Sequence, residues 1–309
     1  MKAQKDSQWS RLKGLGLVLM LVALLSIAAR CGEAPLGSAD NPIVMAFVPS
    51  VETQQLLETV TPLVAMMEEE TGYHIEAMIP TDYATVIEGM GTGKVDVAQL
   101  SPLAYVLANQ KYGAQTILTY VRYGRPFYKG QIVVRADSGI ESLKDLQGKK
   151  FAFVDPASTS GHLYPKALMI REGYDPERFF DEAFFAGGHD KALIALVDGQ
   201  VDGAAVYDGA RDLMTEIIPD IMEVTKVIAE TESIPNDTIV VRQDLPSEMV
   251  EKLRDALLTI ANTEEGKELL KNPYKIDGFV PSQDSDYDPV RLAAEALNID
   301  LEEEVKKAP

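Results

Sequence analysis

The stretch GKVDVAQLSPLA, residues 93–104, recurs as GQVDGAAVYDGA, residues 199–210, at an offset of 106 residues. Two further pairs of motifs recur at nearly the same offset: FVPSVET (47–53) with FVDPAST (153–159), and IVVRAD (132–137) with IVVRQD (239–244). Each match is short enough to arise by chance from the sequence features common to all βα units. The shared offset nevertheless indicates an internal repeat, so we expect two halves of similar structure.

Each half shows the alternation of strand and helix patterns that is typical of an α/β fold. IVMAFV (43–48) is a continuous apolar run, as expected for a buried parallel strand, and residues 53–70 carry apolar side chains at a helical period. Thr81 and Ser101 stand where each could cap a further helix. We therefore predict two α/β lobes joined by IVVRAD and IVVRQD as hinge strands.

The repeat also predicts the boundaries of the two lobes. The chain would leave the first lobe through one hinge strand, build the second lobe, and return through the other hinge strand. The predicted organisation is a signal peptide at 1–30, a lipidated cysteine and tether at 31–42, a first lobe at 43–134 with 238–309, and a second lobe at 135–237.

The strand ends of both lobes predict the position of a ligand site. In open α/β sheets, ligands bind beyond the carboxyl ends of the strands. Four segments follow such ends: Ser50, Ser101, the STSG turn at 158–161, and Tyr207–Asp208. We expect them to face one another across a cleft between the lobes.

The first thirty residues differ from the rest of the chain. Basic side chains precede an apolar run of sixteen residues, 14–29, which is short for a membrane span of about 20 residues and fits the core of a signal peptide. Cys31 follows this run after one residue and resembles the site at which bacterial lipoproteins are lipidated, so we predict an exported protein anchored to the outer face of the cell membrane. Arg30 stands where such sites usually have a small residue, which leaves an uncleaved anchor and plain secretion as alternatives.

Charge and composition exclude several classes of function. The net charge of −19 argues against nucleic acid as a partner, because phosphate backbones favour basic surfaces. A phosphate-binding loop GxxxxGK[ST], a GxSxG motif and an HExxH motif do not occur, and the three histidines are scattered along the chain. We therefore expect a binding protein rather than an enzyme, without a metal or other cofactor.

DPASTSGHLYP, residues 155–165, places Ser158, Thr159 and Ser160 directly before a predicted helix. Hydroxyl groups, free backbone N–H groups and the positive end of the helix dipole together suit a tetrahedral oxyanion. The alternative is ordinary capping of the helix by one of the three hydroxyls.

Five separated motifs resemble, in family order, the phosphate/phosphite/phosphonate-binding proteins of ABC importers. They are FVPSVETQQ (47–55), TDYATVIEGMGTGKVDVAQLSPLAYVLAN (81–109), DPASTSGHLYP (155–165), GGHDKALIALVDGQVD (187–202) and IPNDTIVVR (234–242). The resemblance covers about residues 43–280 and implies a two-lobed periplasmic-binding-protein-like fold of type II. It also implies capture of phosphonate or phosphite, or of phosphate, for delivery to the permease of an ABC transporter.

The resemblance assigns ligand-binding roles to individual residues. The residues that would contact the phosphorus oxyanion are Ser158, Thr159, Ser160, Tyr83, Tyr128 and His189. Asp237 would accept a hydrogen bond from a P–OH group, which sulfate lacks at neutral pH. Asp208 lies near the position at which some members bind an ammonium group with a carboxylate, although Gly209 occupies the matching position.

Some interpretations stay open at the level of sequence. A receptor of the same fold that feeds a sensor kinase, and a protein for a different small anion, are alternative functions. We interpret Arg122, Arg125 and Lys129 as a solvated loop rather than as the border of the cleft. Tyr105 could lie in the cleft or in the core.

Overall fold

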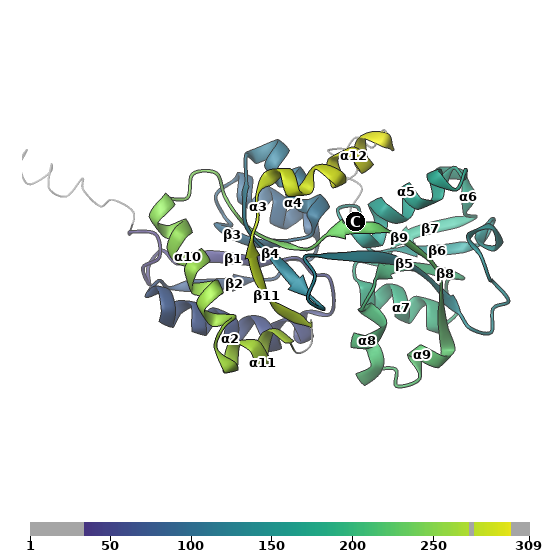
Figure 1. Ribbon diagram of the computed structural model, residues 1–309, viewed down its shortest axis with the longest axis horizontal. Helices are drawn as coiled ribbons and strands as arrows, with labels where there is room; N and C mark the ends of the chain where they lie inside the picture. The colour runs from purple at the N-terminus through teal and green to yellow at the C-terminus, as the bar shows by residue number, and fades with distance from the viewer. Residues whose placement is uncertain (1–33, 272–274, 298–309) are drawn as a thin grey trace, which may run out of the picture. The chain divides into compact units, whose positions relative to one another are not determined.

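The computed structural model describes residues 34–271 and 275–297 (Figure 1). The predicted signal peptide and Cys31 lie outside the described residues. Residues up to Asn41 form a unit of their own, in which Ser38 and Asn41 make an isolated bridge. The unit that begins at Pro42 carries two mixed β-sheets with helices packed on their faces.

The first sheet has six strands in the order β11-β4-β10-β3-β1-β2. In chain order these strands are β1 (Ile43–Phe47), β2 (Ile75–Met78), β3 (Val97–Leu100), β4 (Gln115–Arg122), β10 (Thr238–Val241) and β11 (Ile276–Pro281). Strands β1, β2 and β3 are parallel, whereas β10 runs antiparallel to both β3 and β4. Every residue of β3 and β10 is buried, as expected for apolar strands covered on both faces.

The second sheet has five strands in the order β7-β6-β8-β5-β9. Its strands are β5 (Phe127–Arg135), β6 (Lys150–Phe153), β7 (Glu182–Phe185), β8 (Gly203–Tyr207) and β9 (Thr225–Pro235). Strands β6, β7 and β8 are parallel, and β5 runs antiparallel to β8 and β9. The fold is therefore the predicted two-lobed α/β fold, with one lobe around each sheet.

The two sheets share one plan, which confirms the internal repeat. The order β2-β1-β3-β10-β4 in the first sheet matches β7-β6-β8-β5-β9 in the second. A matching hydrogen bond supports the same register. The Asp96 carboxylate accepts from the backbone N–H of Val44 at 2.8 Å, and the Asp202 carboxylate accepts from that of Lys150 at 2.9 Å.

The first crossing between the lobes lies earlier than the sequence predicted. Among the described residues, β5, which contains IVVR of the first hinge motif, pairs only within the second sheet, so the chain crosses at residues 123–126 and not near residue 134. The second crossing lies at Asn236 and Asp237, between β9 and β10. The two IVVR segments are therefore corresponding inner strands of the two sheets rather than connections between them.

Helices cover both faces of each sheet. Their bounds are α2 (Thr53–Thr71), α3 (Tyr83–Gly91), α4 (Pro102–Tyr112), α5 (Tyr164–Arg171), α6 (Pro176–Phe179), α7 (His189–Val197), α8 (Ala210–Leu213), α9 (Ile221–Val224), α10 (Ser247–Ile260), α11 (Glu264–Lys271) and α12 (Asp288–Ala296). In β5, Ile132 and Val134 pack with α5 and α6, whereas Val133 packs with α7. This alternation is the period of two that a strand buried on both faces requires.

Helix starts follow capping chemistry, with one correction to the sequence prediction. Ser101 caps α4 as predicted, since its hydroxyl accepts from the backbone N–H of Ala104 at 3.3 Å. Thr81 does not cap α3, because Asp82 directly precedes the helix and its carboxylate accepts from the N–H of Thr85 at 2.7 Å.

The C-terminal helices return to the first lobe, where α10 and α11 pack against α2. Helix α12 contacts α4 of the first lobe and also α5 and β9 of the second lobe (Figure 1). A segment remote in sequence thus touches both lobes.

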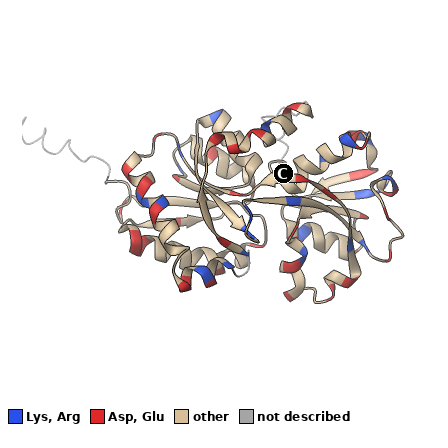
Figure 2. Ribbon diagram, viewed as in Figure 1, with Lys and Arg blue, Asp and Glu red and all other residues tan. Residues whose placement is uncertain are grey.

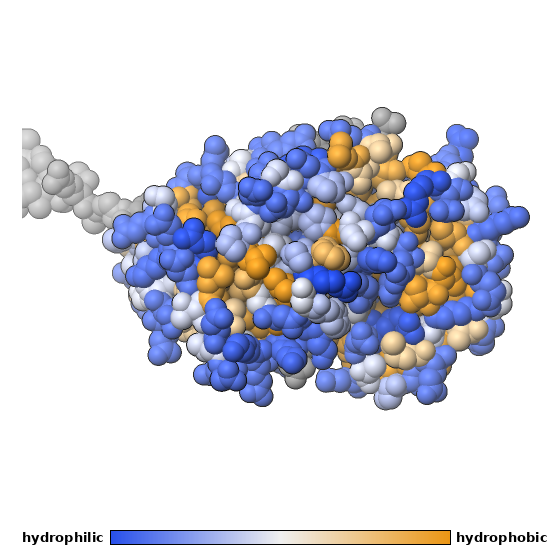
Figure 3. Space-filling model, viewed as in Figure 1, coloured by the Kyte–Doolittle hydropathy of each residue, from blue (hydrophilic) through white to orange (hydrophobic). Residues whose placement is uncertain are grey.

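Charged side chains are spread over both lobes, with acidic groups prominent (Figure 2). The face shown in Figure 3 is mostly hydrophilic, with apolar areas between the charged side chains. Within the described ranges, no helix combines the length and the apolar character needed to span a bilayer.

The repeated aspartates allow a matched test of the fold. Asp96 is 3% exposed and also pairs with Arg242 through Nε at 2.8 Å, whereas Asp202 is half-buried. We expect Asp96→Ala to lower the free energy of unfolding by about 3 kcal/mol, because it leaves a backbone donor and a partly buried guanidinium without their carboxylate. Asp202→Ala should lower the free energy of unfolding, measured by urea denaturation, by about 1 kcal/mol. Equal losses in the two variants would contradict the larger role of Asp96.

Candidate functional site

A small cavity of about 30 Å³ lies between the lobes, where strands of both sheets end. The side chains that line it are Val48, Ser50, Tyr83, Ser101, Arg122, Tyr128, Ser158, Ser160, His189, Tyr207 and Asp237. About 10–15 Å³ of such volume holds one water molecule, so the cavity suits a ligand of few atoms. The predicted strand-end segments do meet here, except that Asp208 lies outside the cavity.

The STSG turn supplies two hydroxyl groups to the cavity. Ser158 and Ser160 are each 2% exposed. Ser158 caps the helical turn at Thr159–Leu163, which leads into α5, and its Oγ accepts from the backbone N–H of Gly161 at 3.1 Å. A Cβ on Gly161 would lie 2.4 Å from Val154 Cγ2, so glycine is needed for the turn to pack on the end of β6. Capping and cavity lining therefore occur in the same residue, because a hydroxyl can accept and donate at once.

The hydroxyl of Thr159 makes a contact between the lobes instead of lining the cavity. Its Oγ1 accepts from the backbone N–H of Leu103, in the first turn of α4, at 2.8 Å. Thr159 is fully buried. Two of the three hydroxyls of the turn therefore line the cavity, and the third is hydrogen-bonded to the first lobe.

His189 presents a neutral donor to the cavity. Burial, together with the charge of Arg122, lowers the pKa of His189 to about 3. Its Nδ1 accepts from the backbone N–H of Tyr207 at 3.3 Å, so the proton of the neutral ring lies on Nε2. Its own backbone N–H donates to the carbonyl oxygen of Ser50 at 2.8 Å, which fixes the start of α7 against the first lobe.

Tyr83 and Tyr128 bring two phenolic hydroxyls from opposite lobes. Tyr83 begins α3, and Tyr128 lies in β5, where its hydroxyl is hydrogen-bonded to Ser160. Burial raises the pKa of both phenols well above the usual value, and the charge of nearby carboxylates raises it further. Both groups are therefore neutral and can donate at any physiological pH.

Arg122 is the cavity residue that the sequence interpretation missed. It ends β4, its side chain is 11% exposed, and its Nη2 donates to Asp237 Oδ2 at 3.2 Å. Burial raises the pKa of Asp237, and the guanidinium opposes that rise. The interpretation as a solvated loop is wrong for Arg122. The available signal was its position directly after the apolar run TILTYV, which makes it the end of a buried strand.

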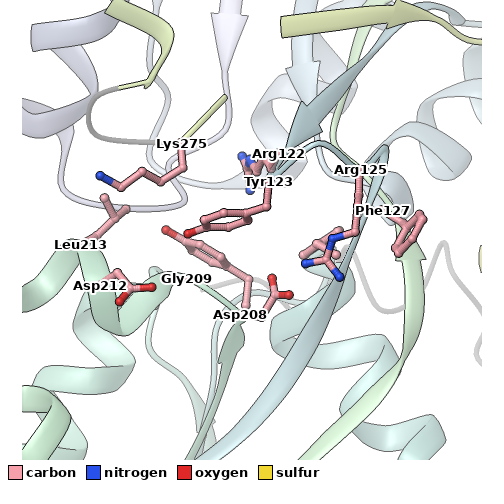
Figure 4. A pocket seen from close by; sticks show the side chains of 11 residues that line it. Arg122, Tyr123, Arg125, Phe127, Asp208, Gly209, Asp212, Leu213 and Lys275 are labelled. Carbon is pink, nitrogen blue, oxygen red and sulfur yellow. The ribbon is translucent and has the colours of Figure 1, made fainter. Parts of the chain in front are cut away.

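A second pocket adjoins the cavity and is lined by Asp208 and by one of the neighbouring cations, Arg125 (Figure 4). This pocket shares Arg122, Tyr128 and Tyr207 with the cavity and adds Arg125 and Asp208, among others. Burial raises the pKa of Asp208, which Arg125 opposes. Lys129 does not border the cavity, since it pairs with Glu230 on the surface at 2.8 Å.

Tyr105 and His162 belong to the core. Tyr105 is fully buried, and its hydroxyl donates to Asp284 at 2.6 Å, away from the cavity. His162 is also fully buried, with Nδ1 at 2.9 Å from the carbonyl oxygen of Pro156. Among the described residues, no group of three or more His, Cys, Asp or Glu side chains is placed to hold a metal ion.

The buried histidine predicts a pH dependence of stability. Between pH 6.5 and the lowered pKa of about 3, the unfolded chain binds a proton at His189 that the folded chain does not bind. The free energy of unfolding should therefore fall by about 2 kcal/mol between pH 7 and pH 5 on account of this group. In His189→Gln, urea denaturation should show a pH-dependent loss that is smaller by this amount.

Gln200→Ala provides the control for this measurement. It changes an exposed side chain that does not titrate, so it should leave the pH-dependent loss as in the parent protein. Burial raises the pKa of Asp155 to about 6, so this group makes the free energy of unfolding rise as the pH falls. Its contribution is the same in all three proteins and cancels in the comparison. An identical pH profile in His189→Gln and the parent would contradict a buried neutral imidazole.

Comparison with known proteins agrees with this geometry. Residues 45–287 match the family model described as ABC transporter, phosphonate, periplasmic substrate-binding protein. The phosphate-import protein PhnD of Mycolicibacterium smegmatis is 33% identical over 87% of this chain and 91% of its own length. The phosphonates-binding periplasmic protein of Escherichia coli is 28% identical over 82% of this chain and 76% of its own length.

A solved structure supports the same assignment. The binding protein component of an ABC phosphonate transporter from Pseudomonas aeruginosa superposes with a TM-score of 0.78 and 28% identity, covering 83% of this chain and 87% of that one. Members of this family are the extracytoplasmic substrate-binding components of importers, not enzymes. The chain therefore belongs to the family of phosphonate periplasmic substrate-binding proteins of ABC transporters.

Proposed function

We propose that this chain captures a small phosphorus oxyanion, either a phosphonate or phosphite, with phosphate as a further candidate, and delivers it to the permease of an ABC importer. The observation that carries the proposal is the convergence of uncharged donors on one buried cavity between the lobes. These donors are Ser158, Ser160, Tyr83, Tyr128 and His189. The backbone N–H groups at the start of the STSG turn add the positive end of a helical segment.

The donor set suits a tetrahedral oxyanion for a physical reason. A buried anion needs several hydrogen-bond donors, because each oxygen that loses water without gaining a partner costs free energy. Hydroxyl and neutral imidazole donors supply those bonds without the large desolvation cost of buried cations. Ser158 and Ser160 would bind from the second lobe and Tyr83 from the first, so one ligand would touch both lobes.

Asp237 supports selection against sulfate. Its Oδ2 accepts from Arg122, which leaves Oδ1 for a donor on the ligand. A monoprotonated phosphorus oxyanion has such a P–OH group, whereas sulfate at neutral pH does not. Sulfate would place its own oxygens against a buried acceptor, which is unfavourable.

Closure of the lobes supports delivery rather than catalysis. Hydrogen bonds between the lobes join Ser101 Oγ to the carbonyl oxygen of Ala157 at 2.9 Å and the Leu103 N–H to Thr159 at 2.8 Å. Opening at the two crossings would break these bonds and admit solvent to the cavity. Hinge closure of this kind encloses a ligand and presents a distinct closed surface to a partner.

The relatives point to the same class of ligand. One relative is a phosphate-import protein and another is a phosphonates-binding protein. Both names describe tetrahedral phosphorus oxyanions, which differ in one substituent on phosphorus. We accordingly include methylphosphonate, phosphite and phosphate as the ligands to be compared.

Calorimetric titration of the purified chain tests the proposal. Methylphosphonate, 2-aminoethylphosphonate, phosphite, phosphate and sulfate are titrated separately at neutral pH. We expect tight binding of at least one phosphorus oxyanion and no heat from sulfate. Ser158→Ala should weaken that binding about tenfold or more, because one hydrogen bond to a charged group is lost. Ser138→Ala, at an exposed turn of the same lobe, should bind as the parent does; silence with all five anions would refute the proposal.

The position of Cys31 supports a lipid anchor on the outer face of the cell membrane. Cys31 follows the apolar run after one residue, Arg30, and is the single cysteine of the chain. In bacteria grown with labelled palmitate, the parent protein should take up label and fractionate with membranes, whereas Cys31→Ala should remain unlabelled. A Cys31→Ala protein that stays in the membrane would indicate an uncleaved anchor. A parent protein found unlabelled in the soluble extracytoplasmic fraction would indicate plain secretion.

A further inference from the structure

The charge of the cavity depends on one cation. Among the described residues that line it, only Arg122 carries a fixed positive charge, and Asp237 is its single carboxylate neighbour there. His189 is neutral, and the serine and tyrosine hydroxyls carry no charge. The guanidinium therefore determines how the cavity responds to charge on a ligand.

The guanidinium is held rigidly by contacts from both lobes. Its central carbon lies 5.6 Å from the ring centre of Tyr120 in the first lobe and 5.8 Å from that of Tyr207 in the second. Both distances are within the range of cation–π attraction. Together with the ion pair to Asp237, these contacts fix the planar group on the cavity wall.

One donor of this rigid group is left over. Arg122 Nε is buried and has no hydrogen-bond partner among the described residues. An unpaired buried donor on a charged group is costly, and because Arg122 lines the cavity, this donor indicates a ligand that supplies the acceptor. An oxyanion oxygen is such an acceptor, and charge-assisted bonds of guanidinium to phosphorus oxygens are short and strong.

Arg122 also stands where the cavity adjoins two other pockets. It lines the pocket of Figure 4 together with Arg125, Asp208 and Asp212. It also lines a mostly apolar pocket together with Asp237, Leu56 and Val60. A substituent on phosphorus that left the cavity in either direction would pass the guanidinium. A positively charged substituent would meet it at close range in a site shielded from water.

We propose that Arg122 is a ligand-binding residue that sets the charge selectivity of the site: it donates to an oxygen of the phosphorus oxyanion and disfavours phosphonates with an ammonium substituent. This inference rests on the proposed function, since it concerns the same cavity. It assigns the cargo to anions with a small, uncharged substituent on phosphorus. Asp208 then has no role in binding an ammonium group.

Two ligands of nearly equal size test the charge selectivity. Ethylphosphonate and aminomethylphosphonate differ by a methyl group in place of an ammonium group. The full chain should bind ethylphosphonate about tenfold or more tightly than aminomethylphosphonate. In Arg122→Gln this ratio should fall towards one, and affinity for methylphosphonate should fall about tenfold or more.

Two further variants, Arg122→Lys and Arg178→Gln, separate the charge of Arg122 from its hydrogen-bonding geometry and provide a control. Lysine keeps the charge but lacks Nε, so Arg122→Lys should bind methylphosphonate more weakly while still disfavouring aminomethylphosphonate. Arg178→Gln changes an exposed guanidinium that lines none of these pockets and should bind as the parent does. Thermal unfolding without ligand shows whether each variant is folded. If Arg122→Gln does not fold, the affinity of Arg122→Lys for methylphosphonate tests the role of Arg122.

The outcomes separate this inference from the proposed function. Suppose that Arg122→Lys and Arg122→Gln bind methylphosphonate as tightly as the parent, whereas Ser158→Ala loses affinity. This result would overturn the role of Arg122 and leave the proposed function standing. Equal binding of ethylphosphonate and aminomethylphosphonate by the parent would overturn the charge selectivity. A parent protein that binds no phosphorus oxyanion would overturn both.

Discussion

The buried ion pair between Arg122 and Asp237 is the interaction on which the arrangement of the two lobes and the cavity depends. Arg122 ends β4 directly before the first crossing, and Asp237 lies in the second crossing, so the pair ties together both connections between the lobes. Backbone bonds reinforce it, since the N–H of Asn236 donates to the carbonyl oxygen of Pro126 at 2.9 Å. Removing one partner of a buried pair leaves an uncompensated charge, which constrains both residues to stay together.

The same pair links the hinge to the ligand site. A binding protein that opens and closes must keep its cavity chemistry intact while the lobes move, and groups at the crossings move least. Arg122 ends a strand of the first lobe and Asp237 lies in the second crossing, whereas Ser158, Ser160 and His189 come from the second lobe. The site therefore combines a charged wall near the hinge with neutral donors that arrive from the other side. Thr159 and the N–H of His189 fix those donors against the first lobe.

Much of the candidate site was predictable because repeats and strand ends are local patterns. The offset of 106 residues aligned Tyr83 with His189, and both begin a helix that reaches the cavity. Thr159 and Asp208 were grouped with the site because sequence proximity cannot say which way a side chain points. Arg122 was set aside because a cluster of cations before a turn usually lies in solvent. Its burial arises from contacts with Tyr207 and Asp237, which are 85 and 115 residues away.

The sequence by itself determined the α/β class, the repeat, the ends of the parallel strands and the STSG turn, since each follows from periodicity, capping chemistry or short motifs. It misplaced the first crossing, because IVVRAD reads equally well as a connection or as an inner strand, and only pairing with β8 and β9 assigns it to the second sheet. The tertiary structure alone decided which hydroxyls line the cavity, which nitrogen of His189 carries the proton and which arginine is buried. These properties depend on partners far away in the chain, and no local pattern encodes the distance between them.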